Sequence, residues 1–161
     1  MAMNSPRAPL KSLDDALLEL LGFAVPTRAP VAVSTFDADG RVLAEDVVSE
    51  LQVPPQDNSS MDGYALRSAD VLSPGIHFRV SQRIAAGSNG HALEPGTVAR
   101  IFTGAPIPPG ADAVVMQEDC EPVQGQTDVI RVMSQPAPGQ WIRRSGEDVT
   151  RGAVVLSRGD R

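Results

Sequence analysis

Three stretches of this 161-residue chain place acidic or hydroxyl side chains directly beside a glycine. They are "SMDGYAL" around Asp62, "FTGAPIP" around Thr103 and "RRSGEDV" around Asp148. A glycine beside a polar side chain lets a ligand approach the backbone closely. Carboxylates suit Mg²⁺, and paired arginines suit phosphate or another oxyanion. These residue types would support metal-assisted chemistry on an anion, although each stretch alone is also what an ordinary surface turn contains.

Several other chemistries lack the residues that they need. Lys11 is the only lysine, which rules out a Walker A loop, and no G-x-G-x-x-G follows a strand-like run. Cys120 is the only cysteine, so an internal disulfide and a multi-cysteine zinc site are excluded. His77 and His91 are too far apart for a metal motif, and no G-x-S-x-G supplies a serine for them to activate.

The composition is that of a globular protein without nucleic-acid or membrane partners. Hydrophobic residues make up 42% and charged residues 21% of the chain. The net charge of −6 lacks the basic footprint of a nucleic-acid binder. No stretch has the length and apolar character of a membrane span or a signal peptide. We therefore expect a cytoplasmic protein.

The clearest element that could support these stretches is an N-terminal helix over residues 12–22. Ser12 is a suitable N-cap, Asp15 can reach back to it, and Gly22 stands where a C′ residue belongs. The apolar positions recur with helical spacing, and they are Leu13, Ala16, Leu17, Leu20 and Leu21. Residues 37–51 are ambiguous: an Asp-Gly turn is followed by either a short helix or a strand.

From residue 76 onward the hydrophobic pattern indicates strands. Short apolar or alternating runs are separated by glycine, proline and aspartate clusters, and they are "IHFRV", "TVARIF", "DAVVMQ", "DVIRVM" and "GAVVLS". This pattern predicts an irregular antiparallel domain of about five to seven strands.

These elements predict an α+β, mostly β fold in two lobes. An irregular antiparallel β-rich lobe, residues 52–139, is inserted into a small α/β linking lobe made of residues 1–51 and 140–161, which includes the N-terminal helix. The proline-marked stretches "QVPPQD" and "QPAPGQ" are plausible hinges between the lobes. Because the sequence stops just past a strand-like run, we expect it to be part of a longer polypeptide.

Three longer motifs carry a family resemblance. In order and spacing, "NSSMDGYALRSAD", "RIFTGAPIPPGADAVVMQED" and "WIRRSGEDVTRGAVVLSRG" resemble the molybdopterin molybdenumtransferase family, which includes the gephyrin E domain. The resemblance runs from about Ser12 to Arg161. It implies a role in the last step of molybdenum cofactor synthesis, in which molybdate is inserted into the dithiolene of molybdopterin. The substrate is adenylylated molybdopterin, the reaction uses a divalent cation, usually Mg²⁺, and AMP is released.

The resemblance also implies partners and further domains. Family members are elongated homodimers whose active site is assembled across the subunit interface. A molybdopterin adenylyltransferase would supply the substrate. The molybdopterin-binding α/β domain and the C-terminal barrel of the family would follow Arg161 and are absent from this chain, so we expect the fragment alone to be inactive.

Carried over position by position, the resemblance assigns the site. It implies catalytic roles for Asp62, Thr103 and Asp148, where Thr103 would hydrogen-bond the pterin or phosphate portion. The metal ligands would be Asp62, Asp148 and Glu147, which would bind Mg²⁺ directly or bind its coordinated waters. Alternatively, the two aspartates would orient the attacking water. The adjacent substrate-binding candidates are Ser60, Arg143 and Arg144.

Two alternatives to an enzyme remain open. The three stretches could belong to a non-catalytic dimerisation or scaffold module that binds a protein partner, or to a freestanding metal-binding regulator. Charge-neutral substitution of Asp62 or Asp148 in the full-length protein would separate the first alternative from catalysis.

Overall fold

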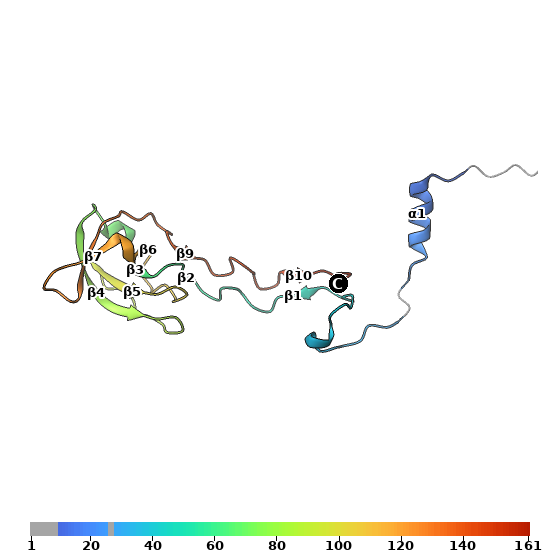
Figure 1. Ribbon diagram of the computed structural model, residues 1–161, viewed down its shortest axis with the longest axis horizontal. Helices are drawn as coiled ribbons and strands as arrows, with labels where there is room; N and C mark the ends of the chain where they lie inside the picture. Colours follow the sequence, from blue (N-terminus) through green and yellow to red (C-terminus); the bar gives the residue numbers. More distant parts are fainter. Residues whose placement is uncertain (1–9, 26–27) are drawn as a thin grey trace, which may run out of the picture.

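The chain is elongated, with a β-sheet body at one end and a helix at the other (Figure 1). A computed structural model describes residues 10–25 and 28–161. Residues 1–9 and 26–27, which fall within the expected linking lobe, lie outside the described residues. No helix in the part of the chain that is described is long and apolar enough to cross a membrane. A long, narrow pair of chain segments extends from the sheet body toward the end of the molecule that carries the helix (Figure 1).

The body is a six-stranded sheet with the order β6-β3-β5-β4-β8-β7. Its strands are β3 (Gly63–Leu66), β4 (Ile76–Ile84), β5 (Thr97–Ile101), β6 (Ala113–Met116), β7 (Cys120–Pro122) and β8 (Val129–Val132). All neighbours are antiparallel except β4 and β5, which run parallel. The connection over residues 85–96 has the length that a parallel crossover needs. The expected antiparallel lobe therefore contains one parallel pairing.

Apolar side chains cover both faces of this sheet. Alternation along each strand sends neighbouring residues to opposite faces, so Val98 joins one buried cluster and Ala99 the other. The first cluster includes Leu66, Phe78, Val98, Val115 and Val132, and the second includes Ala65, Ile84, Ala99, Ile101 and Val114. With a buried apolar cluster on each face, the sheet is a firm base for the loops at the ends of its strands.

Two chain segments, residues 47–59 and 142–156, run side by side away from the sheet. We call them the stalk. In the stalk β1 (Val47–Val48) pairs with β10 (Val154–Leu156), and β2 (Asn58–Ser59) pairs with β9 (Ile142–Arg143). An isolated bridge between Val53 and Val149 lies between these pairs. The ambiguous residues 37–51 thus contain the strand β1, after the short 3₁₀ helix η1 (Thr35–Asp37).

The N-terminal helix α1 (Leu13–Gly22) forms where the sequence predicts it. The Asp15 N–H donates to Ser12 Oγ at 3.0 Å, and the Ser12 hydroxyl donates to the Asp15 carboxylate at 2.7 Å. The C′ assignment of Gly22 is wrong: Gly22 is the last helical residue, and the cap is Phe23 with a right-handed φ of −83°. No residue of α1 is buried.

The predicted fold class, α+β and mostly β, is confirmed. All five strand-like runs from residue 76 onward contain strands, namely β4, β5, β6, β8 and β10. Strand β3, within "SMDGYAL", was not expected. The other short elements are the 3₁₀ helices η2 (Ser68–Asp70) and η3 (Gln117–Asp119).

Candidate functional site

Asp62 and Thr103, forty-one residues apart, are bonded to each other. The Thr103 N–H and the Thr103 hydroxyl both donate to Asp62 Oδ1, each at 2.8 Å. The sheet explains this meeting, because β3 and β5 are antiparallel neighbours in which Gly63 pairs with Ile101. Asp62 lies just before β3 and Thr103 lies just after β5, so both are placed at the same end of these two strands. Two of the three predicted catalytic residues are therefore brought together.

The ionised form of Asp62 is favoured at this end of the strands. The two hydrogen bonds from Thr103, the backbone N–H first and the hydroxyl second, lower the pKa of Asp62 below its ordinary value, and the charge of Arg100 acts in the same direction. The other carboxylate oxygen, Oδ2, accepts no hydrogen bond from the described residues. Asp62 thus presents a fixed negative charge with one oxygen available to a ligand.

The glycine after Asp62 serves the sheet and not a ligand. A Cβ at Gly63 would lie 1.9 Å from the Val115 carbonyl oxygen on the neighbouring strand β6. Gly63 is therefore needed for β3 to approach β6. The glycine after Thr103 has a different role: Gly104 has a left-handed φ of +79°, which lets the chain turn sharply behind Thr103.

Asp148 lies apart from this pair, in the stalk. Its carboxylate accepts hydrogen bonds from Arg143 Nη2, and this contact is the leading cause that raises the pKa of Arg143. Glu147 is the second acid near the same guanidinium, with Oε1 3.7 Å from Arg143 Nε. No hydrogen bond or ion pair of the described chain links Asp148 to Asp62. The third predicted catalytic residue does not join the other two within this chain.

Arg144 is also occupied by an acid of the stalk. Its Nη1 donates to Asp57 Oδ2 at 2.6 Å, and the N–H of the next residue, Ser145, donates to Asp57 Oδ1 at 2.8 Å. The Ser145 N–H leads the causes that lower the pKa of Asp57 below its ordinary value, and Arg144 adds to it. We call Asp57, Arg144 and Ser145 the stalk lock. The sequence pattern did not indicate this role for Asp57.

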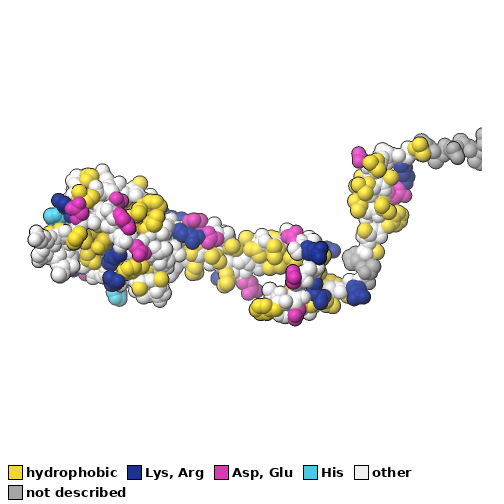
Figure 2. All heavy atoms as spheres, viewed as in Figure 1, with side chains coloured by type: hydrophobic (Ala, Val, Ile, Leu, Met, Phe, Trp, Pro, Cys, Tyr) yellow, Lys and Arg dark blue, Asp and Glu magenta, His cyan; other side chains and the backbone are white. Residues whose placement is uncertain are grey.

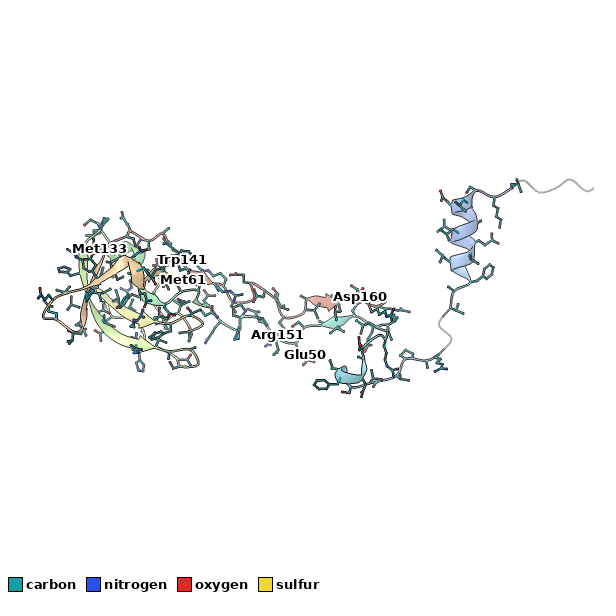
Figure 3. The ribbon with its side chains drawn as sticks, viewed as in Figure 1. Glu50, Met61, Met133, Trp141, Arg151 and Asp160 are labelled. Carbon is teal, nitrogen blue, oxygen red and sulfur yellow. The ribbon has the colours of Figure 1, made fainter. Side chains whose placement is uncertain are left out.

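Ser60, the remaining substrate-binding candidate, lies where the stalk meets the sheet. Its N–H donates to the Trp141 carbonyl oxygen at 3.0 Å. Figure 3 shows Trp141 and Met61 at this junction, while Glu50 and Arg151 lie farther along the stalk. Trp141 has a left-handed φ of 56°, a conformation that is unusual for a bulky residue and that bends the chain at the junction.

The predicted metal ligands lie in two different places in this chain. Within residues 10–25 and 28–161, no three His, Cys, Asp or Glu side chains lie close enough to hold an ion. Asp62 is engaged by Thr103, whereas Asp148 and Glu147 face Arg143 in the stalk. The donor set of the described residues alone therefore does not fit Mg²⁺.

Two surface hollows of the sheet body lack Asp62, Thr103 and Asp148 in their linings. The larger, of about 850 Å³, lies between β3, β4 and β5 and the turn before β8. The smaller, of about 250 Å³, is lined by residues that include Gln56, Asn89 and Pro106. The three predicted catalytic residues therefore do not share either of these hollows.

The comparison with protein families identifies the chain by almost its whole length. Residues 11–161 match the family described as the MoeA N-terminal region (domain I and II). The chain belongs to this family. The resemblance seen in the three motifs is thereby confirmed, and the matched region includes the stalk, the sheet body and α1.

Individual relatives of this MoeA N-terminal region agree. The chain is 42% identical over 135 residues to molybdopterin molybdenumtransferase 2 of Mycobacterium tuberculosis, covering 81% of this chain and 33% of the relative. It is 41% identical over 152 residues to the molybdopterin molybdenumtransferase of Haemophilus influenzae, covering 92% and 36%. The chain therefore spans about a third of the length of the curated relatives that it matches.

Solved structures give the same result. A molybdopterin biosynthesis moeA protein from Pyrococcus horikoshii OT3 matches with a TM-score of 0.72 and 40% identity, covering 78% of this chain and 34% of that chain. A second structure under that name matches with a TM-score of 0.73 and 30% identity, covering 92% and 38%. The elongated arrangement of sheet body and stalk thus has counterparts among solved relatives.

Proposed function

We propose that the chain forms the N-terminal part of an enzyme that inserts molybdate into adenylylated molybdopterin in the last step of molybdenum cofactor biosynthesis. Family membership and the names of the relatives support the broader role in this pathway. The observation that carries the finer proposal is the bonded pair of Asp62 and Thr103 at the end of the central strands. Molybdopterin adenylyltransferase would supply the substrate, and the reaction would take place in the cytoplasm.

The lowered pKa of Asp62 defines what this residue can do. A carboxylate with a pKa well below neutrality is a poor general base, since an effective base titrates near the working pH. Asp62 is better suited to accept a hydrogen bond through its free Oδ2 and so to orient a water molecule or a donor of the substrate. Thr103 holds the carboxylate in position through Oδ1.

A charge-neutral substitution tests this role in a full-length enzyme. The 161 residues would replace the corresponding segment of the Haemophilus influenzae relative, and AMP release from adenylylated molybdopterin would be measured. We expect Asp62→Asn to lower the rate by about 100-fold or more, as the loss of a preorganised electrostatic contact does. Asp39→Asn, an exposed acid near η1, is the matched control. Full activity of a folded Asp62→Asn enzyme would refute the role and favour a scaffold.

The chain alone should not turn over. The described residues contain no cluster of acids that could hold a metal, and the relatives are about three times as long. We expect no AMP release above background when the 161-residue chain is incubated with adenylylated molybdopterin and Mg²⁺. Robust turnover would show that the required groups lie within this chain.

A second proposed role for this region is self-association as a homodimer. The observation that favours it is the exposure of large apolar side chains on α1 and at the far end of the stalk (Figure 2). Leu13, Leu18 and Phe23 are 84%, 69% and 75% exposed. A second copy of the chain would remove these side chains from water. This association is compatible with catalysis and with the scaffold alternative.

A further inference from the structure

Two arginines lie directly opposite each other on the central strands. Arg83 of β4 pairs in register with Arg100 of β5, and Arg100 pairs with Tyr64 of β3. Register-matched residues share a face, so these three side chains form a row across three strands. A bulge between Val80 and Gln82 places Arg83 on this face. Like charges at opposed positions destabilise a sheet, so this pair calls for a compensating negative charge.

Neither arginine has a carboxylate partner among the described residues, but their surroundings differ. Arg100 is held by the Gly63 carbonyl at 2.9 Å and by Gln117 Oε1 at 2.7 Å. The Arg83 side chain makes no hydrogen bond or ion pair in the described part of the chain. Its guanidinium carbon lies 4.4 Å from the centre of the Phe102 ring, and Arg100 lies 4.6 Å from the same ring. Stacking fixes the planes of both guanidinium groups while the donors of Arg83 remain available.

The row lines one wall of the larger hollow. Tyr64, Arg83 and Arg100 line this open hollow of about 850 Å³ together with residues of the segment 122–130. Asp128 is the single acid in the lining, against the two arginines. The volume lies within the range of small-molecule sites. The hollow therefore combines cationic donors, the Tyr64 ring and enough space for a small ligand.

We propose that this hollow, the Arg83–Arg100 groove, binds a phosphorylated ligand that carries a flat heteroaromatic ring. The phosphate accepts hydrogen bonds from the guanidinium groups, and the ring stacks against the guanidinium planes beside Tyr64, whose own ring centre already lies 5.2 Å from the Arg100 guanidinium carbon. The Asp62–Thr103 pair lies near the groove, since Arg100 lines the groove and its charge lowers the pKa of Asp62. The occupant of the groove would be the adenylyl end of the substrate, an assignment that rests on the proposed function.

A binding experiment on the 161-residue chain tests the groove without any catalysis. AMP, adenosine and inorganic phosphate would be titrated separately against ¹⁵N-labelled protein, and amide shifts in residues 122–130 would be followed. We expect AMP to bind with a dissociation constant of about 1 mM. Adenosine and phosphate should bind more weakly than AMP, because adenosine lacks the phosphate contacts and phosphate lacks the ring contacts. Arg83→Gln should weaken AMP binding about tenfold or more, through loss of a charge-assisted contact.

Arg79→Gln is the matched control. Arg79 lies on the same strand, is paired with Glu94 and is absent from the lining of the groove. An unchanged spectrum outside the groove would show that the Arg83 variant is folded. The inference fails if AMP causes no shifts, if AMP binds no tighter than phosphate, or if the two variants weaken AMP binding equally.

The inference and the proposed function can fail separately. If AMP release depends on Asp62 but AMP binding does not change in the Arg83 variant, the proposed function is supported and the binding role of the groove is refuted. AMP binding that depends on Arg83, in a full-length enzyme with no molybdenum insertion, would keep the groove and remove its assignment to that substrate.

Discussion

At the scale of single residues, the position of Asp62 depends on Thr103 through two separate donors. The backbone N–H is the larger cause of the lowered pKa of Asp62, and the hydroxyl is the second. We predict that Thr103→Val, which keeps the N–H and removes the hydroxyl, raises the pKa of Asp62 while leaving it below its ordinary value. Carboxyl ¹³C chemical shifts followed against pH would measure this. Thr103→Ser should preserve the pKa, and an unchanged value in Thr103→Val would contradict the hydroxyl bond.

The residue next to Asp62 carries the second prediction. A Cβ at Gly63 would meet the Val115 carbonyl at 1.9 Å, so Gly63→Ala must push β3 away from β6. Overpacking of this kind lowers the free energy of unfolding by about 1–3 kcal/mol, occasionally more. Denaturant unfolding would measure it. Gly22→Ala is the control because nothing lies within 4 Å of that position, and equal stability of the two variants would show that β3 adapts.

Individual residues also show which parts of the site could be predicted from the sequence. The motifs place Asp62 and Thr103 in one family pattern, and the antiparallel pairing of β3 and β5 brings them together. The separation of Asp148 could not be read from the sequence, because it depends on how far along the stalk each motif lies. The pairing of Arg83 with Arg100 was missed for a related reason: a one-residue bulge decides which face Arg83 occupies.

At the scale of elements, the stalk is held together by few contacts beyond its backbone ladder, and the stalk lock is one of them. The pKa of Asp57 is lowered in the folded chain. Its contribution to stability is therefore complete above its ordinary pKa, ~3.9, and is lost as the pH falls through the lower folded value. We predict an acid-side loosening of the stalk, below about pH 4, that Asp57→Asn removes.

The only tryptophan reports on this loosening. Trp141 lies at the junction of stalk and sheet and is 38% exposed, so its emission should shift to the red as the lock opens. In Asp57→Asn the emission should already be shifted at neutral pH and change less in acid. Asp39→Asn should keep the profile of the unmodified chain. A common profile in all three proteins would exclude Asp57 as the cause.

The elements themselves were predictable to different degrees. The alternating run "IHFRV" identified a strand because buried and exposed residues alternate along the first half of β4, and the shorter, wholly apolar run "AVVM" identified a strand that is buried on both sides. Strand β3 was missed because its glycine and the polar residues before it have the composition of a turn, and only tertiary pairing makes "GYAL" a central strand. The parallel pairing of β4 and β5 was missed because a twelve-residue connection rich in glycine and polar residues does not itself show which way the chain returns.

At the scale of the whole molecule, the two ends differ in how their apolar surface is covered. The sheet body buries clusters on both faces, whereas α1 has no buried residue and stands apart from the sheet (Figure 1). An isolated helix of ten residues is marginal in water, since its few hydrogen bonds barely offset the cost of nucleation. The stability of α1 should therefore depend on whatever covers its leucines.

We predict that the proposed second copy provides this cover. Leu17 and Leu21 lie one turn apart and are 50% and 58% exposed. Burying a leucine stabilises an interface by about 1.5–3 kcal/mol, so Leu17→Glu with Leu21→Glu should weaken dimerisation by about 100-fold or more, while glutamate preserves helix propensity. Sedimentation velocity over a range of concentrations would measure this, and circular dichroism should show helix content falling with dimer content. Asp39→Asn, an exposed polar change outside the helix, should leave both unchanged. A monomeric unmodified chain, or a double variant that dimerises normally, would show that the leucines of α1 are not covered by a second copy.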